Sequence, residues 1–173
     1  MADPVQMAEG HLPARRKPDD LAGYLEALSR PVFAAGISWR VIEAKWDGIR
    51  DGFAGFAPEV VAGYGPDDIG RLLADPRVIR SRGKIEATID NAQAVLELDA
   101  EHGGFDRYLR AHGGFGETVA DLRRQFRFIG DSGACHFLWS VNEPTPPYSE
   151  WFDHSRQTNA GRRGAHRPAR STS

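Results

Sequence analysis

The segment 77–84 holds the residues of this sequence that are best suited to binding an anion. It contains Arg80, Arg82, Gly83 and Lys84, and we predict that it joins two helices in a tight turn. Backbone N–H groups and the dipole at the start of the second helix can hold a phosphate, and the cationic side chains add charge. The alternative is an ordinary helical hairpin whose basic residues are solvated.

Trp39 is the residue best suited to binding a planar ring. It lies at the predicted start of a helix, directly after the small residues of 34–38, with Ser38 as the predicted N-cap. An aromatic ring in such a position can stack on an extruded nucleobase, a contact that contributes roughly 1–3 kcal/mol. The alternative is core packing, because Trp39 shares helical spacing with other apolar residues. These residues are Ile42, Trp46, Ile49 and Phe53, of which we assign Trp46 to the core.

Glu43 is the acid that lies closest to Trp39 on the predicted helix. It follows Trp39 by four residues on the same side, where a carboxylate needs a partner or a chemical role. The alternative is a core helix with an exposed glutamate. Asp131 and Ser132, before the last predicted helix, could also line a pocket, although helix capping is the role that we favour for them.

Other kinds of chemical site are poorly supported. Cys135 is the only cysteine, which excludes an intrachain disulfide and a cysteine-rich zinc site, and the six histidines show no paired ligand spacing. His136 follows Cys135 directly in a predicted helix, so the two side chains point in different directions and form no thiol–imidazole pair. There is no glycine-rich nucleotide loop and no nucleophile elbow. We therefore expect no metal and no cofactor.

Composition and charge indicate one globular domain. The 173 residues suffice for a hydrophobic core, and no apolar run approaches the roughly 18 residues of a membrane span, so we expect a cytoplasmic protein without a membrane partner. The net charge of −2 includes five arginines after Asp153 and no acids there, which leaves the rest of the chain more acidic. An acidic body argues against a large nucleic-acid footprint, so DNA binding requires local patches or the tail.

Helical periodicity and Gly/Pro punctuation predict an all-α fold, a bundle of short helices with no internal repeat. We predict a flexible basic arm over residues 1–18, a helical domain over 19–153 and a disordered arginine-rich tail over 154–173. We expect Trp151 and Phe152 to fold back onto the domain. The predicted helices start at Asp19 or Asp20 (ended or restarted at Pro31), Ser38, Pro58, Pro66, near Ile85, before Val119 and at Asp131 or Ser132, with a looser segment over 105–116.

Several motifs occur in an order and spacing that are similar to those of one known family. They are Gly36-Ile37-Ser38-Trp39, the segments 72–75 and 78–85, Asn91-Ala92, and the segment 126–130. In these motifs the chain resembles the DNA-3-methyladenine glycosylase I family over roughly residues 30–142. The resemblance implies an all-α helix-hairpin-helix glycosylase that removes N3-methyladenine from alkylated DNA. It also implies that Gly36 and Ile37 fill the gap left by the flipped nucleotide, that Trp39 stacks on the extruded base, and that Arg80, Arg82, Gly83 and Lys84 contact the DNA backbone.

The sequence departs from that family at two sites. Pro31 stands eight residues before Trp39, where the family has a glutamate that contacts the polar edge of the base. The cysteine and histidine ligands of the family's zinc site have no counterpart in residues 1–28 or after Asn142, so we expect a zinc-free branch. Glu43 is our own hypothesis for the missing carboxylate, as a catalytic residue that binds the base or stabilises positive charge on the sugar.

We therefore predict a monomeric base-excision repair glycosylase that hydrolyses the N-glycosidic bond of alkylated purines such as 3-methyladenine in double-stranded DNA. A cationic alkylated base is already a good leaving group, so extrusion, stacking and desolvation can supply most of the catalysis. The first alternative is a catalytically inactive homologue that binds DNA or a nucleobase. The second is a helical protein whose partner is another protein.

Overall fold

The part of the chain that the structure describes, residues 15–147 of a computed structural model, consists of helices and turns without a strand. This confirms the all-α prediction. None of the described helices is long and apolar enough to cross a membrane. In chain order the elements are α2 Leu21–Ala34, α3 Trp39–Gly52, the 3₁₀ helix η1 Ala54–Phe56, α4 Pro58–Val61, α5 Pro66–Ala74, α6 Arg82–His102, α7 Phe105–Leu109, α8 Phe115–Gln125 and α9 Asp131–Ser140.

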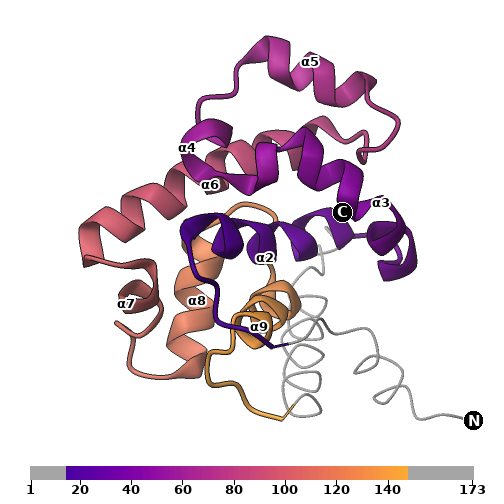
Figure 1. Cartoon of the computed structure of the whole chain (residues 1–173). Helices are drawn as coiled ribbons and strands as arrows, with labels where there is room; N and C mark the ends of the chain where they lie inside the picture. The colour runs from indigo at the N-terminus through magenta and orange to yellow at the C-terminus, as the bar shows by residue number, and fades with distance from the viewer. Residues whose placement is uncertain (1–14, 148–173) are drawn as a thin grey trace, which may run out of the picture.

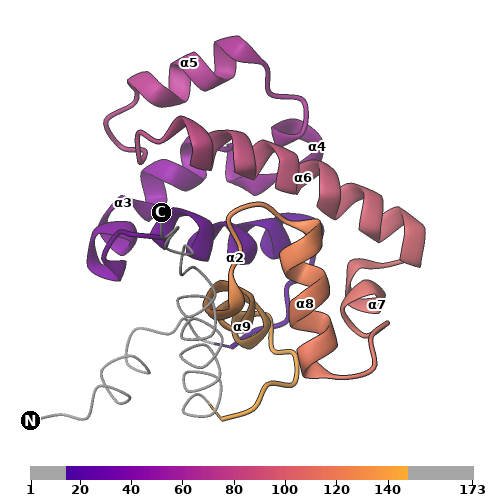
Figure 2. The same cartoon turned by 180° about the vertical axis from the view of Figure 1, so that it is seen from behind.

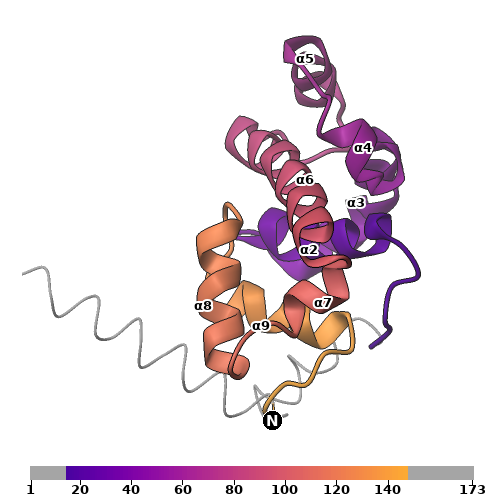
Figure 3. The same cartoon turned by 90° about the vertical axis from the view of Figure 1, so that its left-hand side faces the viewer.

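Helices α2 and α6 contact each other and organise the bundle (Figure 1). Helix α2 also contacts α3 and α9, and α6 also contacts α4, α5 and α7. The views from the front, from behind and from the side show α5 at one end of the molecule and α8 with α9 at the other (Figures 1, 2 and 3). Together, α2 and α6 therefore connect the two ends of the bundle, since α6 contacts α5 and α2 contacts α9.

Stacked aromatic rings fill the core beside α3. Trp46 is 4% exposed, which confirms its predicted place in the core, and its ring stacks on Phe56 at a centroid distance of 5.5 Å. Phe53 stacks in turn on Phe56 at 5.6 Å. The indole N–H of Trp46 donates to Glu26 Oε1 at 2.9 Å, so the polar atom of this buried ring is satisfied. These contacts fix α3 firmly against α2.

Pro31 lies inside α2, and the prediction that it ends the helix is wrong. A proline in a helix interior lacks the N–H that bonds to the preceding turn, which costs about 3 kcal/mol. The apolar residues on both sides of it, Leu28, Val32 and Phe33, are fully buried, and this burial outweighs the lost bond. Pro31 also faces α9 closely, since a Cβ on Gly133 would lie 3.3 Å from the Pro31 Cβ.

Side chains cap several helices. Asp20 accepts from the Gly23 N–H at 2.9 Å and Ser38 caps α3, as predicted. Helix α9 instead has Gly130 as its N-cap, without a side-chain bond, so neither Asp131 nor Ser132 is the cap. The predicted looser segment over 105–116 holds the short helix α7 and the start of α8.

The first described residues contact the body through Arg15 and Arg16. Arg15 donates to the Trp139 carbonyl at 3.2 Å and to the Glu143 carbonyl at 2.7 Å, and its guanidinium lies over the Trp139 ring. The Arg16 N–H donates to the Ser140 carbonyl at 3.1 Å. The rest of the predicted arm, the predicted tail and the expected contacts of residues 151–152 lie outside the described residues.

Candidate functional site

The turn between α2 and α3 presents Gly36 to solvent. Gly36 has a φ of +77°, a conformation that favours glycine, and no atom of the described residues lies within 4 Å of where its Cβ would be. A hydrogen bond of 2.9 Å from the Ile37 N–H to the Ala34 carbonyl closes the turn. Ile37 is half-buried against the core. A small protruding turn of this kind suits insertion into a narrow gap.

Lys84 is buried beneath this turn, and its predicted contact with the DNA backbone stays a prediction. It is 7% exposed, and its Nζ donates to the carbonyl oxygens of Phe33 at 2.9 Å and Ala35 at 2.6 Å. Burial lowers the pKa of its amine. These bonds satisfy carbonyl groups at the end of α2 that have no partner within the helix. Lys84 therefore ties the first turn of α6 to the turn at Gly36.

Arg80 and Arg82 are exposed at the start of α6. The helix begins at Arg82, and Ser81 caps it by accepting from the Lys84 N–H at 3.4 Å. Residues 82–84 therefore form a first helical turn, where backbone N–H groups lack partners within the helix and an anion is favoured. Arg82 also pairs with Glu86 at 3.5 Å, a surface pair that solvent weakens. Contact of Arg80, Arg82 and Gly83 with DNA stays a prediction.

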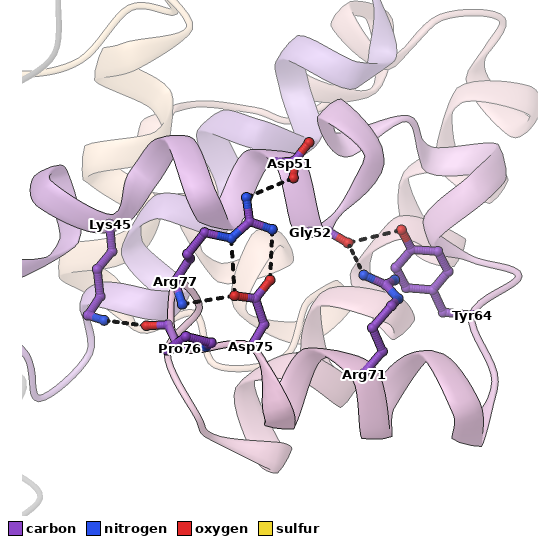
Figure 4. A network of polar contacts seen from close by, with 8 residues as sticks. All are labelled: Lys45, Asp51, Gly52, Tyr64, Arg71, Asp75, Pro76 and Arg77. Carbon is purple, nitrogen blue, oxygen red and sulfur yellow. Dashed lines mark hydrogen bonds and ion pairs between the residues drawn. The ribbon is translucent and has the colours of Figure 1, made fainter.

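A network of polar contacts braces the connection between α5 and α6 against α3 (Figure 4). The Arg77 guanidinium donates to Asp51 of α3 at 3.0 Å and to Asp75 at 2.9 Å. The contacts with Asp75 and, second, with Asp51 raise the pKa of Arg77 far above its usual value, and the hydrogen bonds from Arg77 lower the pKa of Asp75. From α3, Lys45 Nζ donates to the Pro76 carbonyl at 2.8 Å. The α5–α6 connection is therefore held to α3 by two contacts, Arg77 with Asp51 and Lys45 with Pro76.

A glycine lets this connection approach α3 closely. A Cβ on Gly48 would lie 2.4 Å from the Arg77 Cβ and 3.1 Å from the Arg77 carbonyl oxygen, so only glycine fits without a shift. Four residues on, the Gly52 carbonyl accepts from Tyr64 Oη and from Arg71, each at 3.2 Å (Figure 4). Helix α3 thus carries Trp39 at its start and fixes the α5–α6 connection along its second half.

A buried asparagine fixes the loop between α8 and α9 to α6. Asn91 is 1% exposed, donates to the Arg127 carbonyl at 3.1 Å and accepts from the Arg127 N–H at 2.8 Å. This holds the neighbouring Phe128 at a φ of +59°, an uncommon value for a bulky residue. The Phe128 ring is half exposed and lies 3.4 Å from where a Cβ on Gly83 would be. The 126–130 segment therefore flanks the cationic start of α6.

Trp39 is half-buried and stacks on His136 of α9, a pairing that the sequence analysis did not predict. The ring centroids are 4.6 Å apart and the planes are inclined by 21°. His136 is 6% exposed, and burial first and the Arg30 charge second lower its pKa to about 4. His136 and Trp39 lie 97 positions apart, in segments that only the packing of α2 on α9 brings together, so periodicity could not pair them.

Glu43 is exposed on α3, and its catalytic role stays a prediction. Its carboxylate acts on Arg30 of α2, whose pKa burial lowers and whose pKa Glu26 and Glu43 raise in part. Arg30 also lies over the Trp46 ring at 4.5 Å. Arg30 therefore interacts electrostatically with both Glu43 and His136.

The structure brings most of the predicted site together on one side of α6. The turn at Gly36, the first turn of α6 and the 126–130 segment are joined through Lys84 and Asn91. Among residues 15–147, no group of three or more histidine, cysteine, aspartate or glutamate side chains is placed to hold a metal ion.

Comparison with known proteins places these features in a family. Residues 16–132 match the family model described as methyladenine glycosylase. The chain is 42% identical over 65 residues to DNA-3-methyladenine glycosylase 1 of Escherichia coli (strain K12), a match that covers 38% of this chain and about a third (35%) of that protein. It is 27% identical over 128 residues to the DNA-3-methyladenine glycosylase of Haemophilus influenzae, which covers 62% of this chain and 69% of that protein.

Solved structures show the same fold. The 3-methyladenine DNA glycosylase I of Staphylococcus aureus, studied for its recognition of 3-methyladenine, aligns with a TM-score of 0.66 at 25% identity over 82% of this chain and 86% of that chain. A variant of a 3-methyladenine DNA glycosylase I in complex with 3-methyladenine aligns with the same score and identity over 82% of this chain and 87% of that chain.

Proposed function

The chain belongs to the methyladenine glycosylase family, and from this premise we propose that it is a base-excision repair DNA glycosylase. Its substrate is an alkylated purine such as 3-methyladenine in double-stranded DNA. One observation carries the proposal: Lys84 joins the exposed turn at Gly36 to the cationic first turn of α6. A wedge held at a fixed place beside a phosphate anchor is what extrusion of a base requires.

In the proposed reaction each part of the site has a separate task. Gly36 and Ile37 enter the gap in the duplex, Trp39 stacks on the extruded base, and the first turn of α6 binds a backbone phosphate. Water attacks C1′ of the sugar, and the electron pair of the N-glycosidic bond leaves with the base. A cationic base becomes neutral on taking this pair, so it needs no proton in order to leave, and the proton of the attacking water passes to solvent.

Glu43 has an electrostatic part in this proposal. Positive charge develops on the sugar as the bond breaks, and a carboxylate near it lowers the energy of that state. Because Glu43 is exposed in the free protein, the effect depends on DNA covering it and excluding water. Glu43→Gln keeps the size of the side chain and removes its charge, so we expect slower base release from this variant, and an unchanged rate would remove Glu43 from the mechanism.

We also propose that the protein acts as a monomer in the cytoplasm, with alkylated duplex DNA as its partner. The wedge turn and the start of α6 come from one chain, which supports a site that one copy completes. A DNA substrate supports a location where the genome is accessible. Elution of the purified protein as a single-chain species, alone and with a short duplex, tests the monomer.

A second function has its own support. Pro31 stands where the family has a carboxylate, and the His136 ring already stacks on Trp39. Both features favour a homologue that binds DNA or a nucleobase without cleaving it. The two functions differ in whether free base appears.

One assay separates them. The protein is incubated with methylated duplex DNA, and free bases are counted by chromatography. Release of 3-methyladenine that is lost in Trp39→Ala supports the glycosylase. No release, combined with DNA binding that Arg82→Ala weakens, supports the binding protein. The matched control for the charge change is Arg107→Ala, which removes an exposed arginine from α7, beyond the end of α6 that is opposite to Arg82. Loss of one phosphate contact lowers the slope of log affinity against log salt by roughly 0.9.

A further inference from the structure

Phe128 lies between α8 and α9 in a conformation that is unfavourable for its side chain. Its φ of +59° is a left-handed value that bulky residues rarely adopt. The residue is 50% exposed, more than any other large hydrophobic residue in the described part of the chain. A ring that is half exposed gains only part of the burial that could offset this strain. A strained and exposed aromatic ring therefore indicates a contact that the free protein does not make.

The chain on both sides of Phe128 is fixed to the body. Before it, the Arg127 N–H and carbonyl are both bonded to the Asn91 side chain, at 2.8 Å and 3.1 Å. The Arg127 guanidinium also pairs with Asp90 of α6. After it, Ile129 is 7% exposed and belongs to the core. These contacts hold the segment without help from the ring, which favours a role of the ring in binding over a role in folding.

The Phe128 ring lies next to Gly83 in the first turn of α6. Its Cζ and Cε2 atoms lie 3.4 Å and 3.7 Å from where a Cβ on Gly83 would be. Ser81 accepts from the Lys84 N–H, whereas the N–H groups of Arg82 and Gly83 have no hydrogen bond among the described residues. Open N–H groups at a helix start favour an anion, and the proposed function places a phosphate there. That phosphate would lie beside the ring.

We propose that the Phe128 ring packs against a deoxyribose of the DNA backbone, next to the phosphate that the first turn of α6 binds. Every phosphate in DNA joins two deoxyriboses, whose C–H faces are the apolar part of the backbone. In a duplex, stacking covers the faces of the paired bases, so a sugar is the apolar surface that an exposed ring can reach. Such a contact reads no sequence, and it fixes where the backbone lies relative to the turn at Gly36. This inference rests on the proposed function, from which it takes duplex DNA as the partner.

An apolar contact has a salt dependence that differs from that of a phosphate contact. A cation that binds a phosphate releases counterions, so its loss lowers the slope of log affinity against log salt by roughly 0.9. Burial of the exposed half of a phenyl ring releases no counterion, and its loss lowers the affinity by about fivefold at every salt concentration. Variants of Phe128 and of Arg82 should therefore give different patterns, although both residues adjoin Gly83.

Binding of the full chain to a labelled, unmethylated duplex is measured by fluorescence anisotropy over a series of salt concentrations. Phe128→Gly removes the ring and suits the left-handed backbone, whereas Phe128→Tyr keeps the ring. We expect Phe128→Gly to bind about fivefold more weakly with an unchanged slope, and Phe128→Tyr to bind as the wild type does. The matched control is Val60→Ala in α4, because Val60 is 49% exposed and lies outside the proposed site. We expect this control to keep the affinity of the wild type.

Thermal unfolding of the variants separates binding from folding. Glycine adopts a φ of +59° without strain, so we expect Phe128→Gly to unfold at a higher temperature than Phe128→Ala. Both variants lack the ring, so we expect both to lose affinity to the same extent. Phe128→Asn is a second variant without the ring whose residue type tolerates this backbone, and we expect it to bind as Phe128→Gly does.

Four results would overturn the inference. The first is a wild type that does not bind the unmethylated duplex, and the second is a folded Phe128→Gly whose affinity stays within about twofold of the wild type. The third is a lowered slope in Phe128→Gly, as in Arg82→Ala, which would assign the ring to supporting the phosphate site. The fourth is a loss of affinity for methylated duplex alone, which would assign the ring to stacking on the extruded base.

The binding measurement and the base-release assay can fail separately. If the wild type releases no base but Phe128→Gly shows the expected loss of affinity, the proposed glycosylase fails and the sugar contact stands. If the wild type releases base and Phe128→Gly binds the duplex as the wild type does, the sugar contact alone fails.

Discussion

Gly48→Ala tests the close approach between α3 and the α5–α6 connection. The added Cβ would lie 2.4 Å from the Arg77 Cβ, whereas carbon atoms pack best at about 3.5–4.0 Å. It would also lie 3.1 Å from the Arg77 carbonyl oxygen. Neither atom is the end of a flexible side chain, so the backbone of the connection or of α3 must move. We therefore expect the substitution to strain the network that holds Arg77 to Asp51.

The expected size follows from two opposing effects. Alanine in place of glycine stabilises a helix interior by roughly 0.5–1 kcal/mol. Overpacking destabilises by about 1–3 kcal/mol. Gly70→Ala is the matched control, because Gly70 is an exposed glycine within α5 and none of the described residues lies within 4 Å of its Cβ position. The helix-propensity gain is shared by both variants, so their free energies of unfolding should differ by about 1–3 kcal/mol.

Urea unfolding and thermal unfolding of both variants measure this difference. For a chain of this size, each kcal/mol corresponds to about 2–4 °C in Tm. We expect Gly70→Ala to be slightly more stable than the wild type and Gly48→Ala to be less stable than Gly70→Ala. In duplex binding, we expect Gly48→Ala alone to lose affinity, because its connection presents Arg80 differently. Equal stabilisation by the two substitutions would show that α3 and Arg77 are not in contact as described.

Three further predictions concern buried polar groups. Asn91→Ala removes both hydrogen bonds to the Arg127 backbone, and we expect the free energy of unfolding in urea to fall by about 2–3 kcal/mol. A fall below about 0.5 kcal/mol would contradict the role of Asn91 in fixing the loop between α8 and α9. Lys84→Met leaves the Phe33 and Ala35 carbonyls without their donor, so we expect lower thermal stability and slower base release. An unchanged rate of base release would show that the turn at Gly36 does not need Lys84 for activity. The folded pKa of His136, about 4, lies below its usual value of 6.5, so the unfolded chain binds the proton more tightly. The free energy of unfolding is therefore highest above about pH 6.5 and falls by roughly 3 kcal/mol as the pH drops to 4. In urea unfolding, we expect this fall to be shallower in His136→Phe. Parallel curves of unfolding free energy against pH for the two proteins would refute the lowered pKa of His136.

Local patterns predicted the local structure well. Asp20 and Ser38 cap their helices because their oxygens accept from N–H groups only three residues away, a relation that the sequence shows directly. Trp46 is in the core because helical spacing places it with Ile42 and Ile49. The interruption predicted at Pro31 did not occur, because the burial of its neighbours is a tertiary effect that outweighs local propensity.

The site was predictable only where one segment supplies it. The turn at Gly36 and the start of α6 are each continuous in sequence. The turn occurs as expected, whereas α6 begins at Arg82, three residues before its predicted start near Ile85. That Lys84 points inward, toward carbonyl groups some 50 residues earlier, depends on how α6 crosses the end of α2. The stack of His136 on Trp39 depends in the same way on α9. Cys135 and His136 are neighbours in the sequence, but this does not indicate that the His136 ring packs against Trp39 of another helix.

Helix α3 has a consequence for how sequences of this kind can change in length. Gly48 lies nine positions after Trp39, which corresponds to a rise of about 13.5 Å. Inserting or deleting one residue between them would turn the indole by about 100° and shift it by about 1.5 Å relative to the connection that Arg77 holds. The turn over residues 110–114, between α7 and α8, does not set this spacing. Related sequences should therefore differ in length at 110–114 and keep the spacing between positions 39 and 48.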